Sequence, residues 1–249
     1  MNIPKSHPRY KSLLSREVVV SGFKNGLTSL AGLTAHGRGE TFDYLLGEET
    51  FFFAHAALDA AASLLLLSKF PVISVNGNTA ALAGRELVEL SEILDAPLEI
   101  NLFHPEKERE RAISKHLKYL GAKKVLTPGG GLIPFLRSNR RMISREGQKK
   151  ADVVLVPLED GDRTEALIKM GKKVITIDLN PLSRTAQKAD ITIVDHIVRS
   201  MPILIKKITA LKKETPEALR SILGQYDNET VLKDAIFQIN QRLTKLSYE

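Results

Sequence analysis

The sequence predicts an α/β fold: a doubly wound, mostly parallel sheet of about six strands, with helical segments at both ends of the chain. Short apolar runs rich in β-branched residues recur from residue 71 onward, helical stretches separate most of them, and the spacing is too long for hairpins. Such alternation implies right-handed crossovers that cover both faces of a parallel sheet. Runs that are apolar at successive positions fit strands buried on both sides. The expected strands are residues 72–75, 98–102, 125–126, 153–156, 174–177 and 191–194.

Helical patterns precede and follow these strands. Apolar side chains recur at helical spacing over residues 10–18, and an Ala- and Leu-rich segment follows Thr50. The apolar breadth of that segment is typical of a helix that is buried or faces a second subunit. Near the end of the chain, one apolar helical face runs from Val231 to Leu243. The expected division, within one integrated domain, is an N-terminal helical segment (1–70), an α/β core (71–197) and C-terminal helices (198–249).

Composition excludes several classes of protein. The 249 residues are 43% apolar and 26% charged, as in ordinary globular domains. The absence of cysteine excludes disulfides, Cys-ligated zinc, iron–sulfur clusters and thiol nucleophiles. No apolar run approaches 18 residues and the first ten residues are polar, so we expect no membrane span, no signal peptide and a cytoplasmic location. The net charge of +7 favours anionic ligands.

The positive charge is concentrated in residues 103–150, which hold thirteen Lys or Arg and four Glu. This segment can attract a phosphorylated metabolite or RNA, or it can simply be a solvated basic surface. Aromatic residues make up only 6% of the chain and none lies within residues 136–150. Single-stranded nucleic acids are usually bound by stacking on aromatic side chains. Because such side chains are scarce here, we expect the protein to bind no nucleic acid.

Polar clusters follow all six predicted strands. In open parallel sheets, ligands bind beyond the carboxyl ends of the strands, so these clusters predict one shared site. Each cluster alone is also consistent with ordinary turns and helix caps. The clusters are residues 76–79, Asn101, 127–131, 159–163, 178–185 and 195–196.

The residue types suggest roles for some of these clusters. Residues 76–79 would place backbone N–H groups at a helix N-terminus, which suits an anion. Three carboxylates within residues 159–162 repel one another unless Mg²⁺ or a substrate ammonium offsets them, although they could instead cap the following helix. Asp178 can hold a ribose hydroxyl and Arg184 can reach phosphate oxygens. Gly129-Gly130-Gly131 either cradles a phosphate or forms a turn.

Standard signatures of other site classes are missing from the sequence. No Gly-x-Gly-x-x-Gly follows a strand, and there is no Walker-type P-loop, no Gly-x-Ser-x-Gly elbow and no His-Glu-x-x-His zinc motif. Any nucleotide site in this chain must therefore be built differently.

Several longer blocks together resemble the archaeal phosphopantothenate synthetase family, 4-phosphopantoate–β-alanine ligase. The resemblance spans essentially residues 2–246. The matching blocks are Ile3 to Tyr10, Gly32 to Glu40, Val75 to Asn78, Val156 to Thr164 and Asp178 to Arg184.

The resemblance implies a Rossmann-like homodimer that acts in coenzyme A biosynthesis. The implied reaction joins 4-phosphopantoate to β-alanine with ATP and Mg²⁺, and it gives 4′-phosphopantothenate, AMP and diphosphate through a phosphopantoyl adenylate. Positioning and charge neutralisation can support such chemistry without a covalent protein nucleophile. Two alternatives remain open: a non-catalytic module that binds a nucleotide or a sugar phosphate, and an RNA-binding protein that uses the basic surface.

The resemblance also implies site residues. The implied ATP contacts are Arg16, Arg38, Asp178, Leu179, Asn180, Arg184, Thr185, His196 and Ile197. Family members often carry Asn where this chain has His196, which implies contact through the backbone there. From position and chemistry, we expect Asn76, Asn78 and Asn101 to bind 4-phosphopantoate, and Glu159, Asp160 and Asp162 to hold the β-alanine ammonium or Mg²⁺. The expected catalytic residues are Asp160, Asp162 and Arg163, and the expected metal ligands are Asp160 and Asp162.

Overall fold

The computed structural model describes residues 3–103, 106–136, 141–158 and 160–248. Its centre is a six-stranded, wholly parallel sheet in the order β3-β2-β1-β6-β7-β8. This is the doubly wound order in which the sheet grows outward in both directions from its first strand. The expected fold and all six expected strands are confirmed. The strands are β1 (Pro71–Val75), β2 (Leu98–Ile100), β3 (Val125–Leu126), β6 (Val153–Leu155), β7 (Lys173–Ile177) and β8 (Ile191–Ile193).

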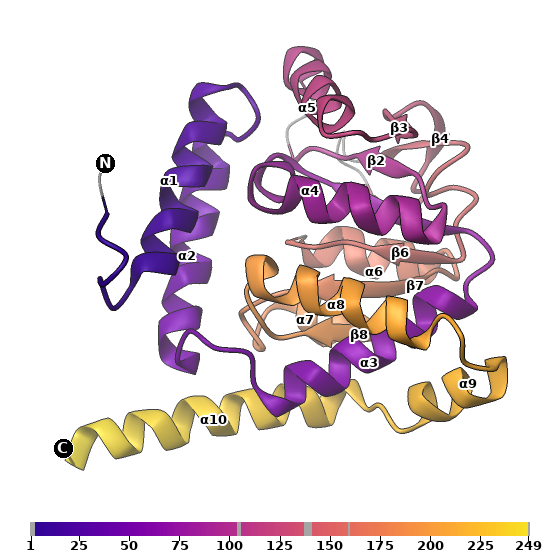
Figure 1. Cartoon of the computed structure of the whole chain (residues 1–249). Coiled ribbons are helices and arrows are strands. Elements are labelled where there is room, and N and C mark those ends of the chain that lie inside the picture. The colour runs from indigo at the N-terminus through magenta and orange to yellow at the C-terminus, as the bar shows by residue number, and fades with distance from the viewer. Residues whose placement is uncertain (1–2, 104–105, 137–140, 159, 249) are drawn as a thin grey trace.

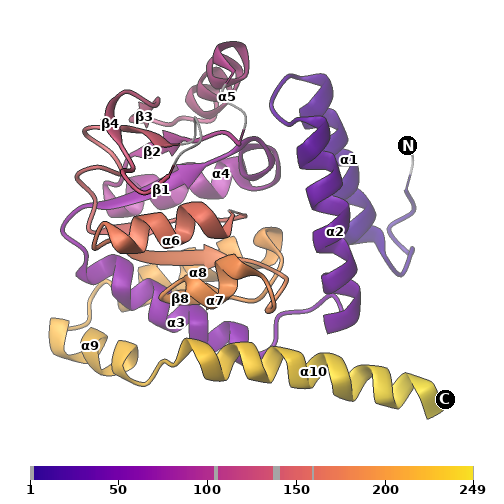
Figure 2. The ribbon, with the colours of Figure 1, turned by 180° about the vertical axis from the view of Figure 1, so that it is seen from behind.

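Helices cover both faces of the sheet. On one face α4 (Gly77–Leu94) packs against α5 (Lys107–Tyr119) and α8 (Ile197–Leu211), and α8 packs against α3 (Phe52–Leu67) (Figure 1). The opposite face carries α6 (Gly161–Lys169) and α7 (Arg184–Lys188), which pack against each other (Figure 2). The larger apolar core lies under the first group of helices, and a smaller one lies under α6.

The connection from β3 to β6 differs from expectation. Gly129-Gly130-Gly131 was expected to cradle a phosphate or to form a turn, but two of these glycines begin a strand, β4 (Gly130–Leu132). That strand pairs antiparallel with β5 (Met142–Ser144), and together they form a small second sheet. Gly130 adopts a φ of 74°, a left-handed conformation that glycine enters without steric cost. The glycines therefore shape the entry into this small sheet.

An N-terminal helical hairpin stands opposite the carboxyl edge of the main sheet. It consists of α1 (Tyr10–Lys24) and α2 (Leu30–Leu46), and both views show it set apart from the sheet's two covering layers (Figures 1 and 2). The hairpin reaches the sheet through α4, against which both of its helices pack. This placement closes the space beyond the strand ends, so it determines where a ligand can bind.

The C-terminal segment is helical, as expected, and comprises the rest of α8, α9 (Pro216–Gly224) and α10 (Asn228–Tyr248). The apolar face of α10 is only partly buried: Val231 and Ala235 pack inside, whereas Ile236 and Leu243 are 41% and 47% exposed. The second half of α10 extends beyond the body of the molecule (Figure 1). Within the described residues, no helix has both the length and the apolarity needed to span a membrane.

Candidate functional site

A cavity of about 330 Å³ lies between α2 and the carboxyl ends of the strands. It is lined by residues that are far apart in the sequence, from α2, from the start of α4, from the loop after β2 and from the ends of β6, β7 and β8. Seven of the residues expected to form a site line it: Arg38, Asn76, Asn78, Asn101, Leu179, His196 and Ile197.

Asn76 joins the two halves of the sheet at the floor of this cavity. Its Oδ1 accepts a hydrogen bond from the Thr79 N–H (3.0 Å) and so caps α4. Its Nδ2 donates to the carbonyl oxygen of Leu158 (3.0 Å), just beyond β6. Leu158 has a φ of 56°, an uncommon conformation for a branched side chain, and this hydrogen bond helps to hold it. Because the strand order reverses between β1 and β6, Asn76 marks the point where doubly wound sheets bind their ligands.

Close approach of the helical hairpin to α4 seals one wall of the cavity. Asn78 Nδ2 donates to the Gly32 carbonyl oxygen on α2 (2.8 Å). A Cβ atom at Gly77 would lie 2.2 Å from the Leu27 carbonyl oxygen, so only glycine permits this approach. Asn78 and Gly77, which follow β1, thus have a structural role: they hold the helical hairpin against α4.

A buried ion network anchors the other end of α2. Arg199 on α8 donates to both carboxylate oxygens of Asp43 on α2 (3.0 and 2.5 Å) and to Asp195 Oδ1 (2.8 Å). Thr50 Oγ1 completes the network by donating to Asp195 Oδ2 (2.7 Å). Burial raises the pKa of Asp195, although the Arg199 charge opposes the shift. Two acids buried around one guanidinium fix the orientation of α2, and therefore of its cavity-facing residues.

His196 and His36 face each other across the cavity, with their rings at a centroid distance of 6.0 Å and nearly perpendicular. Burial lowers the pKa of His196 to about 4 and also lowers the pKa of His36. His196 Nδ1 accepts the Val198 N–H (3.2 Å) and caps α8, so the neutral ring carries its proton on Nε2. At neutral pH the ring is therefore an uncharged hydrogen-bond donor.

Replacing His196 by asparagine should reduce the sensitivity of the fold to acid. The unfolded chain protonates this histidine below its ordinary pKa of 6.5, whereas the folded chain does so only near pH 4. The wild type should therefore lose up to about 3 kcal/mol of stability as the pH falls through this window, while asparagine still caps the helix but does not titrate. Urea unfolding of both proteins at pH 7 and 4.5 measures the difference. Equal losses would show that His196 is not held neutral.

Arginines from the helical hairpin approach the cavity around a single carboxylate, Glu40. Arg16 forms a bidentate pair with Glu40, with N–O distances of 2.8 and 3.1 Å, and Arg9 Nη2 and the Ser12 hydroxyl also donate to it. These hydrogen bonds outweigh burial and lower the Glu40 pKa. Arg38 lines the cavity and is exposed, and within the described residues it makes no hydrogen bond or ion pair. Arg38 is thus available to an anionic ligand, whereas Arg16 is held by Glu40.

The loop after β7 is organised by Asp178. Its carboxylate accepts the Asn180 N–H (3.0 Å) and the Ser183 hydroxyl, and burial raises its pKa even though the Arg38 charge opposes the shift. Leu179 from this loop lines the cavity, but Asp178, Asn180, Arg184 and Thr185 do not. Arg184 instead forms ion pairs with Asp162 and Glu165, and Thr185 is buried.

Two of the three expected carboxylates, Asp160 and Asp162, do not line the cavity. Asp160 caps α6 by accepting the Arg163 N–H (2.8 Å), as the alternative interpretation had it, and Asp162 pairs with Arg184. Arg163, which was expected to be catalytic, has a completely buried side chain that donates to Gln148 Oε1, and its catalytic role stays a prediction. Glu159 lies outside the described residues. Among the described residues, no group of three or more His, Cys, Asp or Glu side chains is arranged to hold a metal ion.

Sequence reasoning missed several residues that line the cavity. His36 and Glu40 lie in the block from Gly32 to Glu40, in which only Arg38 was singled out. Phe103 and Arg109 come from the start of the basic segment, whose alternating charges are typical of a solvated helix. His36 and Glu40 could have been found from the sequence, because both lie in a block that resembles the family. No signal in the sequence distinguished Arg109 from its neighbours.

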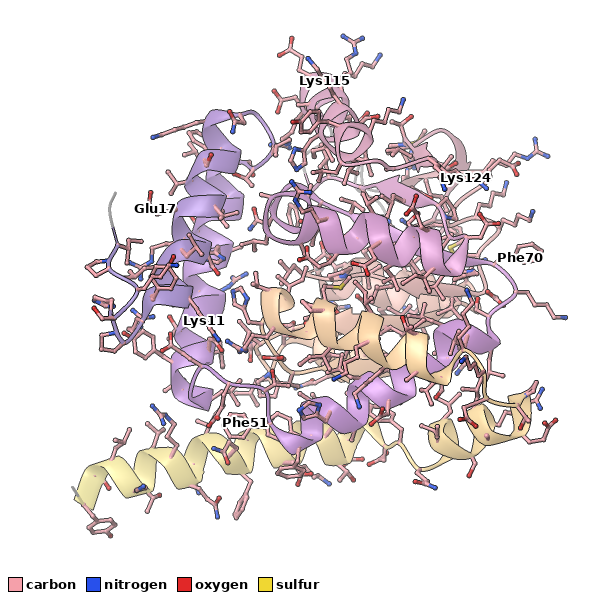
Figure 3. All side chains as sticks on the ribbon, in the orientation of Figure 1. Lys11, Glu17, Phe51, Phe70, Lys115 and Lys124 are labelled. Atoms are coloured by element: carbon pink, nitrogen blue, oxygen red, sulfur yellow. The ribbon has the colours of Figure 1, made fainter. Side chains whose placement is uncertain are left out.

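Most of the basic segment does lie at the periphery. Lys115 on α5 and Lys124 before β3 point outward, away from the cavity (Figure 3). A shallow, open groove beside Lys115 is lined by four basic side chains and one acid, Lys107, Arg111, Lys115, Lys118 and Glu110. The arrangement favours the interpretation of a solvated surface.

Comparison with known proteins places the chain in a family. Residues 53–242 match the family described as phosphopantothenate/pantothenate synthetase. A Thermococcus kodakarensis protein named 4-phosphopantoate–β-alanine ligase is 52% identical, with 100% of this chain and 96% of that protein aligned. Proteins of the same name from Thermococcus onnurineus and Methanosarcina mazei are 51% and 49% identical, with 99% and 100% of this chain and 95% and 98% of theirs aligned. The chain therefore belongs to the phosphopantothenate/pantothenate synthetase family.

Proposed function

We propose that this protein is an ATP-dependent ligase that condenses 4-phosphopantoate with β-alanine. The products would be 4′-phosphopantothenate, AMP and diphosphate, in a step of coenzyme A biosynthesis. The observation that carries the proposal is the cavity at the reversal of the strand order, lined by Arg38, Arg109, three amide side chains and a neutral histidine. Because the proposed substrates are highly charged metabolites, we also place the protein in the cytoplasm.

The reaction needs binding and charge stabilisation more than covalent participation by the protein. In the first step a carboxylate oxygen of 4-phosphopantoate attacks the α-phosphorus of ATP, and diphosphate leaves. In the second step the β-alanine nitrogen attacks the acyl carbon of the adenylate, and AMP leaves. Each step requires aligned reactants and donors for the charge on phosphate oxygens, as Arg38 and His196 Nε2–H would supply.

The half of the cavity on the side of β6 to β8 suits the nucleotide. Its lining includes Leu158, Leu179 and Ile197, which can contact an adenine ring, and Arg38 on α2 can reach the phosphates. Arg16 does not line the cavity itself, but its partner Glu40 does. We propose that Arg16 contacts the ATP phosphates from the edge of the cavity. Asp178, Asn180, Arg184 and Thr185 would then act by shaping the loop that carries Leu179.

The described carboxylates do not fit a protein-built magnesium site. Asp160 is used as a helix cap and Asp162 as an ion-pair partner. Magnesium is commonly held by substrate phosphates and water with few protein ligands. We therefore propose that Mg²⁺ serves only as the counterion of the ATP phosphates and assign it no residue.

Turnover assays test the proposed function. The protein is incubated with ATP, Mg²⁺, 4-phosphopantoate and β-alanine, and nucleotides are separated by chromatography. AMP should form in proportion to 4′-phosphopantothenate and only when both other substrates are present. Formation of ADP would refute the adenylate route. Nucleotide binding without turnover would support the alternative of a non-catalytic binding module. Salt-sensitive binding of RNA that is unaffected by ATP would support the alternative of an RNA-binding protein.

We propose that the protein is a homodimer whose interface includes the exposed apolar face of α10. Leu243 and Leu246 are 47% and 54% exposed and lie three residues apart on the apolar face of this helix, and exposed apolar surface of this kind commonly marks an interface. Replacing Leu243 by aspartate should convert the dimer to a monomer in analytical ultracentrifugation, because the charge would be buried on association. The control is Lys245→Asp in the same helix. A wild-type monomer would refute the proposal.

A further inference from the structure

We propose that Arg109 binds the phosphate group of 4-phosphopantoate and thereby distinguishes this substrate from unphosphorylated pantoate. The inference rests on the proposed function and assigns a specificity-determining residue to it. It follows from the positions of the two arginines in the cavity, taken together with the positions of the two anionic groups in the substrate.

Among the described residues, two arginines line the cavity, and they belong to opposite halves of it. Arg38 lies on α2, and its charge acts on Asp178 at the end of β7, on the side of the last three strands. Arg109 lies in the first turn of α5, which follows β2 and packs against β2 and β3. The sheet order places these strands on either side of β1. One cavity therefore offers two guanidinium groups on its two sides.

The substrate carries anions at its two ends. In 4-phosphopantoate a carboxylate terminates one end of a four-carbon chain and a phosphate the other. The carboxylate is the reacting group, so it must face the α-phosphate of ATP. With the nucleotide on the side of Arg38, the phosphate of the substrate must point toward β2 and α5. Of the described residues that line the cavity, Arg109 supplies the guanidinium on that side, and guanidinium groups bind phosphate oxygens strongly and with defined geometry.

The surroundings of Arg109 match the remaining groups of the substrate. Leu82, Leu102 and Phe103 supply apolar lining that can contact the two methyl groups of pantoate, and the amide of Asn101 can bond its hydroxyl. The Arg109 side chain is only 12% exposed, and its ion pair with Glu106 is long, at 3.6 Å. A mostly desolvated guanidinium interacts with a dianionic phosphate more strongly than a surface arginine does.

The experiment compares two substrates in the wild type and three variants. For the wild type, Arg109→Gln and the control Arg111→Gln, kcat/KM is measured with 4-phosphopantoate and with pantoate as the acid. Arg109→Gln should reduce kcat/KM for 4-phosphopantoate about 30- to 100-fold, leave the KM for ATP within about twofold and reduce any turnover of pantoate much less than that of 4-phosphopantoate. Arg109→Lys should recover part of the loss. Arg111, which is exposed two residues away on the same helix, should tolerate the change.

Each other outcome has a defined meaning. Equal losses with both acids would overturn the proposal, because they would show a structural role without phosphate recognition, and unchanged kinetics would remove Arg109 from the site. If the wild type forms no AMP at all, the proposed function fails, and calorimetry then tests the inference separately. Binding of 4-phosphopantoate to the wild type but not to Arg109→Gln would still support a phosphate site. Equal binding, or no binding to either protein, would overturn it.

Discussion

Replacing Arg38 by alanine is expected to lower kcat/KM for ATP by about 100-fold while the free energy of unfolding stays within about 0.5 kcal/mol of the wild-type value. Arg38 is exposed, lines the cavity and makes no hydrogen bond or ion pair in the described part of the chain, so the fold does not depend on it. A phosphate oxygen of ATP would lose a charge-assisted hydrogen bond that forms fully only in a desolvated site. Steady-state kinetics with varied ATP, together with urea unfolding, measure both quantities.

The matched control is Arg220→Ala. Arg220 is exposed on α9 and forms an ion pair with Glu217, three residues earlier on the same helix. This variant should retain wild-type kinetics. If Arg38→Ala also retained them, Arg38 would not bind the triphosphate, and the nucleotide would have to be placed elsewhere in the cavity.

Replacing Arg199 by leucine is expected to destabilise the protein by about 3–5 kcal/mol at pH 7. Asp43 and Asp195 are 3% and 1% exposed, so the variant would leave two carboxylates buried without their shared cation. Loss of this network should also free α2 and reduce activity, because α2 carries His36, Arg38 and Glu40. Urea unfolding and turnover assays measure the two effects.

The pH dependence identifies the cause. Burial already raises the pKa of Asp195, and removal of Arg199 would raise it further. A carboxyl group with a higher pKa in the folded than in the unfolded state destabilises the fold as the pH rises above the unfolded pKa, because the unfolded chain ionises more readily. The stability deficit of Arg199→Leu should therefore shrink as the pH falls from 7 to 5, and Asp43→Asn in the same protein should recover part of it. A deficit that does not change with pH would indicate lost packing instead of unpaired charge.

The sheet could be predicted from the sequence because a strand that is buried on both faces is recognised from a short run of neighbouring residues. Residues 153–156 are apolar at every position and residues 174–177 are β-branched at every position, and short runs of this kind are typical of a strand buried on both faces. The polar residues that follow each strand were predicted for the same reason, since the carboxyl ends of parallel strands share an edge. Asn76, Asn101 and His196 line one cavity as a result.

What the sequence could not show depends on contacts between distant residues. Arg163 and Asp160 follow a strand just as Asn76 does, but Arg163 turns inward toward Gln148 and Glu99 on the other face of the sheet. The pair Asp43–Arg199 joins residues 156 positions apart and determines where α2 lies. Periodicity carries no information about such pairings, so it can predict the polar edge but not which polar side chains of that edge face the cavity.

Transfer of labelled oxygen tests the central claim most directly, namely that the carboxylate of 4-phosphopantoate attacks the α-phosphate of ATP. The wild type is given 4-phosphopantoate labelled with ¹⁸O in its carboxylate, together with ATP, Mg²⁺ and β-alanine, and the AMP is analysed by mass spectrometry. The account predicts one ¹⁸O atom in each AMP formed. AMP without label, or label in inorganic phosphate formed with ADP, would contradict it.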